Sequence, residues 1–340
     1  MVLKVDIGVF AHDEVQGIAA MVAELGRQDI LLAPDIAARV LILANGCTDG
    51  TAAAAERASA AIGGRIEVVD LPEGGKSRTW NRFVHDLSRS DADILIFCDA
   101  DIELPEPDSL SRLVRGLAAR PSLWAFNSRP VKDLVHRPEG LSRLDRLIAA
   151  SSGMLDDWKT AICGQLYAMR ADSARSLHLP IGLPVEDGFL RAMILTDALT
   201  APEDTGLIDG GTVWHVYASE RSIGALIRHQ TRIVIGSAVN AACFAHLRDL
   251  PRRARRPELT RAAGDEEWLR RVIRQRLPAL PWGYVPAHFL FKRLARLVQN
   301  PRDLLRPRRL FVAIAGFGFD LIVYLNAQIR MARGVGAGHW

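Results

Sequence analysis

The residue pattern that most clearly predicts chemistry is the acidic pair Asp99 and Asp101, which follows the apolar run DILIFC at residues 93–98. Two carboxylates at this spacing, at the end of a buried strand, can reach a metal ion and a ribose hydroxyl together. The negative charge of a nucleoside diphosphate must be neutralised before that group leaves, and a hard divalent cation with oxygen ligands does this. The pair therefore predicts a site for a hard divalent cation. Because such pairs also occur by chance, their place after an apolar strand gives the prediction its weight.

Three other polar stretches are candidates for binding or catalysis. ANGCTDGT at 44–51 makes a turn and opens a helix, whose N-terminus favours negative charge nearby. In GGKSR at 74–78, two glycines let the backbone approach a ligand and Lys76 can meet phosphate, although the spacing of a P-loop is absent. VEDG at 185–188 enters a helix, where a carboxylate is well placed to be the general base that an attacking hydroxyl needs. Each stretch alone also fits an ordinary turn or helix start.

The elements that must position these residues alternate between strands and helices. The pattern predicts strands at 5–10, 39–43, 65–69, 93–98 and 122–126, and helices at 14–25, 51–62, 77–87 and 107–117. Such alternation predicts an α/β fold, with a mostly parallel sheet covered by helices on both faces. Ligands bind at the carboxyl ends of the strands in such sheets, which is where the polar stretches fall.

The pattern changes after residue 157. It predicts strands at 160–169 and 211–216, helices at 186–195 and 222–247, and a breaker-rich linker at 249–257 (DLPRRARRP). Two or three helices punctuated by prolines follow. We therefore expect one domain over residues 1–247 and a basic, helical extension over residues 248–340.

Composition and charge support two functional regions. The chain has 340 residues, 49% of them hydrophobic and 24% charged, which is enough for a large core and argues against wholesale disorder. Residues 221–340 hold 22 Lys and Arg against 7 Asp and Glu, a net charge of +15, so the first 220 residues carry −11. The basic part could face anionic lipid or polymer, or its arginine-rich helices could simply be solvated. Four cysteines without a CxxC pair indicate reduced thiols in a cytoplasmic protein.

The apolar segment 310–329 bears on a membrane role. Asp320 lies in its middle, and a charge at the centre of a bilayer is costly, so a helix in the plane of the membrane or a buried helix is expected instead of a span. With the arginine clusters before it, the segment predicts a peripheral anchor on an anionic membrane surface, at the inner face of the cytoplasmic membrane. The start MVLKVDIGVF does not read as a signal peptide, and no nucleic-acid-binding motif is present.

Between residues 5 and 236, these motifs together resemble the family 2 glycosyltransferases, which have the GT-A fold. Asp13-Glu14 follows the opening strand as Asn-Glu does in that family. ANGCTDGT resembles the base-binding loop, with Asn45 where an aspartate is frequent, and GGKSRTWN resembles the Gly-Lys…Asn segment. Asp-Ala-Asp matches the metal and ribose motif, and Glu186-Asp187 resembles the pair that holds the catalytic aspartate. Of the Gln-x-x-Arg-Trp motif of processive members only Arg232 matches, which argues against processive polymer synthesis.

The resemblance implies that a hexose moves from a nucleotide-sugar donor to a hydroxyl of a lipid-linked or saccharide acceptor, with inversion, in the synthesis of cell-envelope polysaccharide or glycolipid. The implied roles are ribose binding by Asp99, ligation of Mg²⁺ or Mn²⁺ by Asp101, a nucleotide site lined by Glu14, Asn45 and Lys76, proton removal by Asp187, and stabilisation of the departing diphosphate by Arg232. Some GT-A enzymes complete the metal site with a histidine from a late strand, so His215 is a candidate ligand, although a structural role is the alternative.

Two other functions remain open from the sequence. A sugar-phosphate nucleotidyltransferase can share the sheet and the acidic site, but it would usually have a glycine-rich, basic loop where this chain has AHDEVQG. A non-catalytic nucleotide-sugar-binding protein would bind the donor without turning it over.

Overall fold

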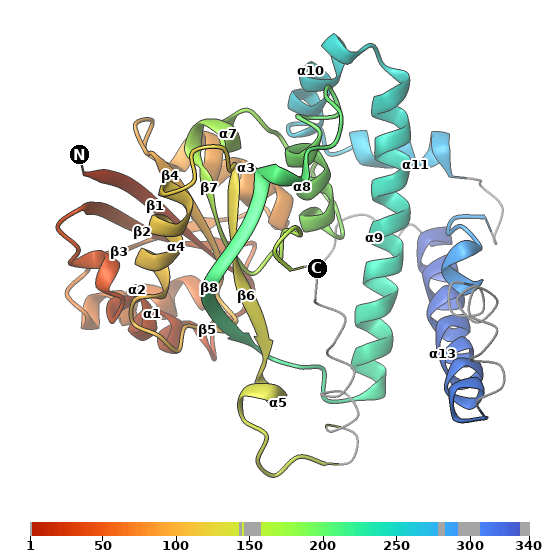
Figure 1. Ribbon diagram of the computed structural model, residues 1–340, viewed down its shortest axis with the longest axis horizontal. Helices are drawn as coiled ribbons and strands as arrows, with labels where there is room; N and C mark the ends of the chain where they lie inside the picture. Colours follow the sequence, from red (N-terminus) through yellow and green to blue (C-terminus); the bar gives the residue numbers. More distant parts are fainter. Residues whose placement is uncertain (1, 143–144, 146–157, 278–282, 292–306, 334–340) are drawn as a thin grey trace. The chain divides into compact units, whose positions relative to one another are not determined.

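The chain divides into two compact units, each described here by itself (Figure 1). The computed structural model describes residues 2–142, 145, 158–277, 283–291 and 307–333. The sheet unit comprises Met1–Ile181, Glu186–Ser219 and Pro251–Asp265, and the helical unit comprises Gly182–Val185, Glu220–Leu250 and Glu266–Trp340. The two units are defined by their compactness, and each contains segments from both sides of the predicted domain boundary between residues 247 and 248. They therefore do not test the division into two functional domains, which stays a prediction.

The sheet unit is built on an eight-stranded mixed sheet with the strand order β3-β2-β1-β4-β7-β6-β8-β5. The strands are β1 Leu3–Ala11, β2 Ile36–Asn45, β3 Ile66–Leu71, β4 Ile94–Asp99, β5 Ile102–Glu103, β6 Ala125–Lys132, β7 Leu166–Arg170 and β8 Ile208–Tyr217. The first half, β3-β2-β1-β4, is parallel, and β6 and β8 are parallel to each other. β7 runs antiparallel to both β4 and β6, and β5 antiparallel to β8. The predicted α/β fold with a mostly parallel sheet is confirmed.

Helices cover both faces of this sheet (Figure 1). The helices of the unit are α1 Ile18–Gly26, α2 Thr51–Ala61, α3 Lys76–Arg82, α4 Ser109–Ala118, α5 Asp133–His136, α7 Ala171–Arg175, α8 Glu186–Leu195 and α10 Arg252–Ala262, with short helical turns at Asp29–Leu31, Phe83–Leu87 and Thr205–Leu207. Alternate residues of β1 serve the two faces: Val9 joins the core formed with α1 and α4, whereas Gly8 lies against the ring of Phe83. Burial on both faces explains why the parallel strands read as continuous apolar runs.

The structure corrects two sequence-based boundaries. The strand predicted at 160–169 begins only at Leu166, because the backbone turns at Gly164, whose φ is +65°. The linker predicted at 249–257 is wrong, since α10 starts at Arg252. Pro251 precedes the helix, where its missing N–H costs nothing, and Pro257 is accommodated inside it, where the burial of Leu259 and Ala262 against the sheet unit compensates for one lost hydrogen bond.

The helical unit is formed around a long helix, α9. Its helices are α9 Ile223–Asp249, α11 Trp268–Arg276 and α13 Pro307–Ala332. The Ser222 hydroxyl accepts a hydrogen bond from the Ala225 amide at 3.1 Å and caps α9. α11 buries Trp268, whose ring meets the edge of His246 at a centroid distance of 5.6 Å. Among the residues that the structure describes, no helix combines the length and the apolar character needed to cross a bilayer.

Candidate active site

The parallel strands bring the loops of the first three candidate stretches to one edge of the sheet. Phe10 of β1 pairs with Asp99 of β4, and Ala11 of β1 pairs with Ala44 of β2. The residues that follow these positions therefore leave the sheet side by side. Glu14, Asn45 and Asp99 share this edge, as the order of strands predicts.

Lys76, the first residue of α3, lies at the centre of a charged cluster. Its Nζ is 2.7 Å from the carboxylate of Asp99 and 3.3 Å from Oε1 of Glu186, and it donates a hydrogen bond of 3.0 Å to the carbonyl of Gly164. Although burial opposes its charge, Asp99 and Glu186 raise the pKa of Lys76 above its ordinary value. The ammonium thus stays charged and holds three separate segments together.

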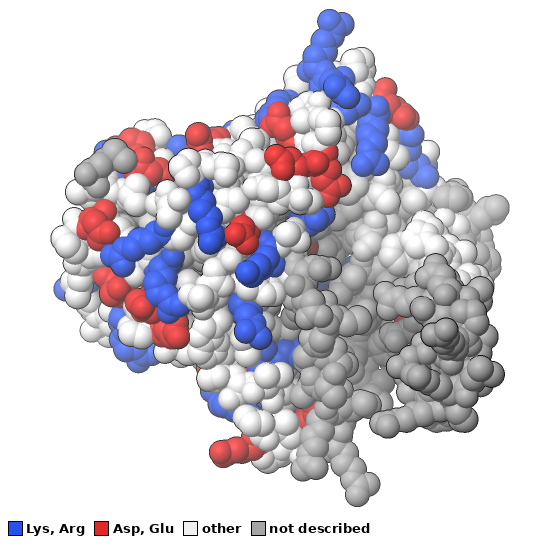
Figure 2. All heavy atoms as spheres, in the orientation of Figure 1, with Lys and Arg blue, Asp and Glu red and all other residues white. Residues whose placement is uncertain are grey.

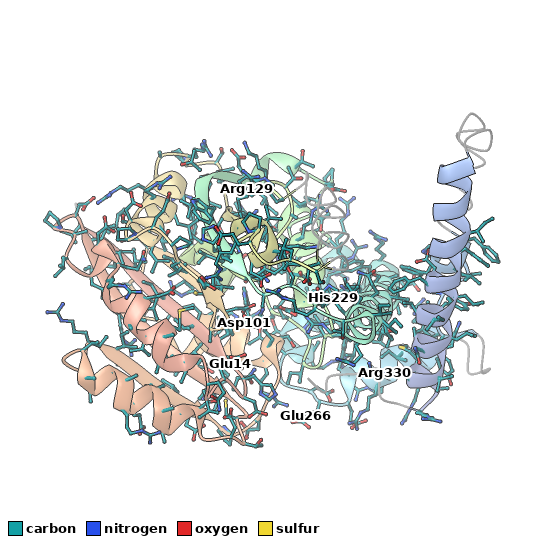
Figure 3. All side chains as sticks on the ribbon, turned by 90° about the horizontal axis from the view of Figure 1, so that it is seen from below. Glu14, Asp101, Arg129, His229, Glu266 and Arg330 are labelled. Carbon is teal, nitrogen blue, oxygen red and sulfur yellow. The ribbon has the colours of Figure 1, made fainter. Side chains whose placement is uncertain are left out.

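The carboxylates around Lys76 outnumber it. Burial, with contributions from Asp101 and Glu186, raises the pKa of Asp99 from 3.8 to about 7, even though Lys76 acts in the opposite direction. Glu14 and Asp101 lie close together (Figure 3), and burial followed by the charge of Asp101 raises the pKa of Glu14. This edge of the sheet therefore holds an excess of negative charge that a cation would relieve.

Asp187 lies beside this cluster, at the start of α8. Gly164 lies next to both groups: a Cβ at that position would lie 3.4 Å from Oδ2 of Asp187, and the Gly164 carbonyl binds Lys76. The charge of Asp187 also contributes to the raised pKa of Lys76. The structure thus brings Asp187, Lys76 and Asp99 together from three distant parts of the sequence.

His215 is fully buried on β8 and connects to the cluster through Gln165. Its Nδ1 lies 2.9 Å from Oγ of Ser128, and its Nε2 lies 3.1 Å from Oε1 of Gln165. The carbonyl of Gln165 in turn accepts a hydrogen bond of 2.8 Å from the Asp99 amide. Burial lowers the pKa of His215 to about 3, so the ring is neutral, the form that binds metals. A metal at Nε2 would displace Gln165, and the ligand role of His215 stays a prediction.

Asn45 ends β2 and is buried. Its side-chain oxygen Oδ1 has no hydrogen-bond partner among the described residues. The next residue, Gly46, has φ +58°, and a Cβ there would lie 2.6 Å from the Cα of Gly74. A glycine is therefore needed at 46 for the loops after β2 and β3 to approach this closely. The loop presents a buried, unpaired acceptor at the same edge as the acidic cluster.

The model of the Glycosyl transferase family 2 family matches residues 6–175 of this chain, which is half of its length. The chain belongs to glycosyltransferase family 2. Its fold is similar to that of the mannosyltransferase PcManGT from Pyrobaculum calidifontis, solved with GDP-Man and Mn²⁺: the TM-score is 0.56 at 18% identity, over 96% of this chain and 87% of that one.

Two further solved structures have lower TM-scores against this glycosyltransferase. Glucosyl-3-phosphoglycerate synthase from Mycobacterium tuberculosis has 20% identity over 69% of this chain and 78% of that one, with a TM-score of 0.48. Mannosyl-3-phosphoglycerate synthase from Rubrobacter xylanophilus has 19% identity over 69% and 73%, also with a TM-score of 0.48. No curated protein matches the sequence.

Two further residues of this glycosyltransferase, Arg232 and Trp80, have surroundings of their own. Arg232 is an exposed residue of α9 in the helical unit, so its role toward a diphosphate stays a prediction. Trp80 is a core residue: it stacks on Phe97 at a centroid distance of 5.6 Å, and its Nε1 donates to the hydroxyl of Tyr167 at 3.1 Å.

Sequence reasoning missed the contributions of Glu186, Gly164 and Gln165. Glu186 was seen only as the neighbour of Asp187, yet it is the more buried of the two and pairs with Lys76. The one signal in the sequence is Gly164 itself, since a glycine inside an apolar, strand-like stretch can mark a close approach of backbones.

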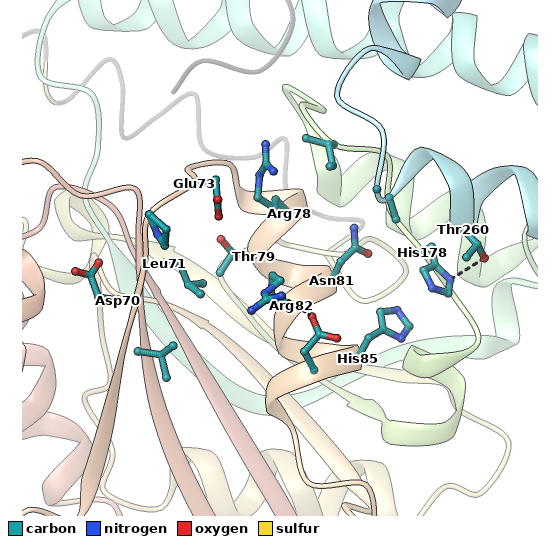
Figure 4. Close-up of a pocket in the computed structure, with 16 residues that line it drawn as sticks. Asp70, Leu71, Glu73, Arg78, Thr79, Asn81, Arg82, His85, His178 and Thr260 are labelled. Carbon is teal, nitrogen blue, oxygen red and sulfur yellow. Dashed lines mark hydrogen bonds and ion pairs between the residues drawn. The ribbon is translucent and has the colours of Figure 1, made fainter.

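A hollow lies along α3 in the sheet unit of the glycosyltransferase, with a volume of about 740 Å³ (Figure 4). Arg78, Asn81 and Arg82 line it from α3. The charges in it are mixed, since Arg82 pairs with Asp86 at 3.1 Å and other carboxylates share the wall. Asn81, which matches the asparagine of the Gly-Lys…Asn segment, binds the backbone of Leu179 through hydrogen bonds of 2.7 and 3.0 Å. This asparagine therefore fixes a loop.

Proposed function

We propose that this glycosyltransferase moves a hexose from a nucleotide-sugar to a hydroxyl of a lipid-linked or saccharide acceptor, with inversion and with the help of a divalent metal. The observation that supports this most strongly is the cluster in which Lys76 joins Asp99 and Glu186 beside Asp187. The similar structure of PcManGT holds GDP-Man and Mn²⁺, which are the kinds of donor and metal that this cluster would take.

The residues at this edge fit a hard divalent cation. Asp101 is exposed just beyond β4 and can ligate Mg²⁺ or Mn²⁺ through oxygen, with His215 as a further candidate ligand. The raised pKa values of Asp99 and Glu14 reflect carboxylates crowded in a buried place, where a cation would favour their ionised forms. When bound, the metal would neutralise charge on the leaving diphosphate.

The donor would be held by residues of three loops. The unpaired Oδ1 of Asn45 can accept a hydrogen bond from an N–H group of the base. Asp99 can accept one from a ribose hydroxyl, and Glu14 lines the same edge. Lys76 already contacts two carboxylates and a carbonyl, so its part is to fix these groups in place. We propose that Arg232 stabilises the departing diphosphate.

The acceptor would be activated by Asp187. Its carboxylate takes the proton from the acceptor hydroxyl as that oxygen attacks the anomeric carbon, and the bond from this carbon to the diphosphate oxygen breaks. A single displacement inverts the configuration at the anomeric carbon. The carboxylate lies beside Gly164, close to the cluster that we propose for the donor.

The base role is tested by Asp187→Asn. We expect the variant to bind the donor as the wild type does and to lose transfer by at least a hundredfold, the lower range for a general base. Asp172→Asn, the same change in the first turn of α7, is the matched control and should transfer normally. Normal transfer by Asp187→Asn would refute the assignment.

The donor and the metal are tested by binding and slow hydrolysis of a panel of nucleotide-sugars. We expect one donor to bind with Mn²⁺ or Mg²⁺, and Asp101→Ala to lose that binding. Binding without transfer or hydrolysis would favour the non-catalytic alternative, and binding of none of the panel would refute the proposed function.

We also propose that the helical unit binds an anionic membrane surface, as a peripheral enzyme of glycolipid or cell-envelope polysaccharide synthesis at the inner face of the cytoplasmic membrane would. One face of α13 exposes apolar side chains: Ile314, Leu321, Ile322, Leu325 and Ile329. α11 buries one face and exposes Arg270, Arg271 and Arg274 on the other. An exposed apolar stripe, in a unit that also exposes arginines, supports binding to anionic lipid.

By contrast, Lys and Arg intermingle with Asp and Glu over the face of the sheet unit seen in Figure 2.

Flotation with vesicles tests the membrane proposal. The wild type should float with anionic vesicles, and Leu325→Glu should reduce this binding several-fold. Ala241→Glu, which adds the same charge at an exposed position of α9, should float like the wild type. A wild type that stays in solution beside anionic vesicles would refute membrane binding.

A further inference from the structure

A group of side chains with mixed ligand chemistry lies beside the donor edge. It consists of His12 and Asp13, which follow β1, and Cys47, which follows β2. One ligand atom from each of the three lies within 4.8 Å of the other two, and His12 Nε2 is 4.0 Å from Oδ2 of Asp13. An imidazole, a carboxylate and a thiol together are the ligand types of zinc sites, whereas Mg²⁺ prefers oxygen ligands and is not bound by thiols.

The two loops that carry these residues are fixed to each other independently of any ion. The Thr48 amide donates a hydrogen bond of 2.7 Å to Oδ1 of Asp13, and the Thr48 hydroxyl donates a longer one of 3.4 Å to Oδ2, the oxygen that lies 4.0 Å from His12 Nε2. The Glu14 amide donates one of 2.8 Å to Oγ1 of Thr51. Asp13 has φ +51°, a left-handed conformation that costs an aspartate some free energy. The hydrogen bonds between the two loops compensate for this cost and hold the carboxylate of Asp13 in place.

The orientation of His12 suits a metal ligand. Its Nδ1 lies 2.7 Å from the carbonyl of Asn45, which can only accept, so Nδ1 carries the proton and Nε2 keeps its lone pair. A metal-binding histidine usually has its second ring nitrogen bound to a carbonyl or carboxylate in this way. Cys47 is half-buried, and its thiol is free of any disulfide.

We propose that His12 Nε2, Asp13 Oδ2 and Cys47 Sγ bind Zn²⁺. A shared ion at bond lengths of about 2.0–2.3 Å needs ligand atoms about 3.5 Å apart, so the side chains close by about 1 Å, which their partial exposure allows. On binding, the bond between sulfur and zinc forms, the S–H bond breaks, and the proton goes to solvent. Water takes the fourth position. This site is distinct from the oxygen ligands of Asp99 and Asp101.

A consequence for the donor follows, and it rests on the proposed function. The ring of His12 binds the carbonyl of Asn45, the residue whose side-chain oxygen is the proposed acceptor for the base. A zinc ion on His12 and Cys47 lies at the base end of the donor site. Zinc is therefore expected to weaken donor binding, whereas the metal at Asp101 supports it.

Cobalt is the probe for the site itself. Co²⁺ bound through a thiolate has an intense charge-transfer absorption in the near ultraviolet that oxygen ligands do not produce. We expect this band in the wild type and its loss in Cys47→Ser, with at least a tenfold weaker Co²⁺ affinity in His12→Ala. Cys163→Ser removes a thiol of similar exposure and should keep the band. Absence of the band at saturating Co²⁺, or its persistence in Cys47→Ser, would overturn the site.

Donor binding with Zn²⁺ added to excess Mg²⁺ is the second measurement. The donor Kd should rise several-fold in the wild type and stay unchanged by zinc in Cys47→Ser. The cobalt band is read without any donor, so its presence supports the zinc site even if no nucleotide-sugar binds and the proposed function fails. A band together with a zinc-independent Kd would overturn the effect on the donor.

Discussion

We expect the charge of Asp99 to lower the free energy of unfolding of the protein at neutral pH. The variant Asp99→Asn, which lacks this charge, should then be more stable than the wild type. Its carboxylate is largely buried among other acids, and its pKa in the folded protein is raised from 3.8 to about 7. The folded state therefore holds this proton more tightly than the unfolded state does. As the pH rises from 4 to 7, the folded protein must either keep a proton that the unfolded chain has released or bury an unfavourable charge.

The size of the effect follows from the raised pKa. At about 1.4 kcal/mol for each pH unit, the difference between 3.8 and about 7 corresponds to about 4 kcal/mol of stability. This stability is present below pH 4, is lost gradually as the pH rises, and is absent above pH 7. Asparagine has the shape of the protonated acid and no proton to lose. Asp99→Asn should thus match the wild type at pH 4 and exceed it by about 4 kcal/mol at pH 8.

Thermal unfolding at pH 5 and pH 8, with a chelator present and no nucleotide, measures this difference. We expect the Tm of Asp99→Asn to exceed that of the wild type by several degrees at pH 8 and by much less at pH 5. Adding the donor and Mn²⁺ should raise the Tm of the wild type more than that of the variant, since the variant lacks the carboxylate that we propose for binding the ribose.

The matched control is Asp101→Asn, the same change at an exposed position two residues further on. It should give no comparable gain at pH 8. A variant Asp99→Asn that is less stable than the wild type at pH 8, or a difference that is equal at pH 5 and pH 8, would refute the reasoning. The ion pair with Lys76 would then outweigh the cost of burying the carboxylate.

Three further changes probe other parts of the site. His215→Ala should weaken Mn²⁺ binding about tenfold or more by calorimetry, and an unchanged affinity would dismiss the ligand role. Asn81→Ala removes both hydrogen bonds to Leu179 and should lower the free energy of unfolding by about 2–4 kcal/mol in a denaturant titration; a change below about 0.5 kcal/mol would contradict the loop-fixing role. Gly46→Ala should weaken donor binding, because its Cβ would meet the loop after β3 at 2.6 Å, whereas Gly50→Ala, also at positive φ but facing open space, should weaken it far less.

The parallel half of the site could be predicted from the sequence. Apolar runs end at Ala11, Asn45 and Asp99, and the carboxyl ends of parallel strands meet at one edge of a sheet. The positions of Glu14, Asn45 and Asp99 follow from that rule alone. Lys76 could also be predicted, because the loop after β3 must turn back at the same edge.

The rest depends on contacts that no local pattern encodes. Gly164 and Gln165 reach Lys76 and Asp99 only because β7 runs antiparallel beside β4. The pairing of Glu186 with Lys76 joins residues 110 positions apart, and nothing near Glu186 in the sequence indicates it. The sequence predicts a linker where α10 begins at Arg252, because prolines and arginines dominate the composition there. Burial of one face of the helix against distant segments stabilises it instead.

The path of the chain through the two units has a consequence for its biosynthesis. The sheet unit needs Pro251–Asp265, where the Ala262 carbonyl accepts a hydrogen bond from the Ile181 amide at 3.2 Å and Arg256 pairs with Asp197. When residue 265 leaves the ribosome, all of α9 has emerged, whereas its partners α11 and α13 have not. The nascent chain must therefore carry an incompletely packed helix while the sheet unit closes, so the two units fold in an interleaved order, with apolar surface open to chaperones.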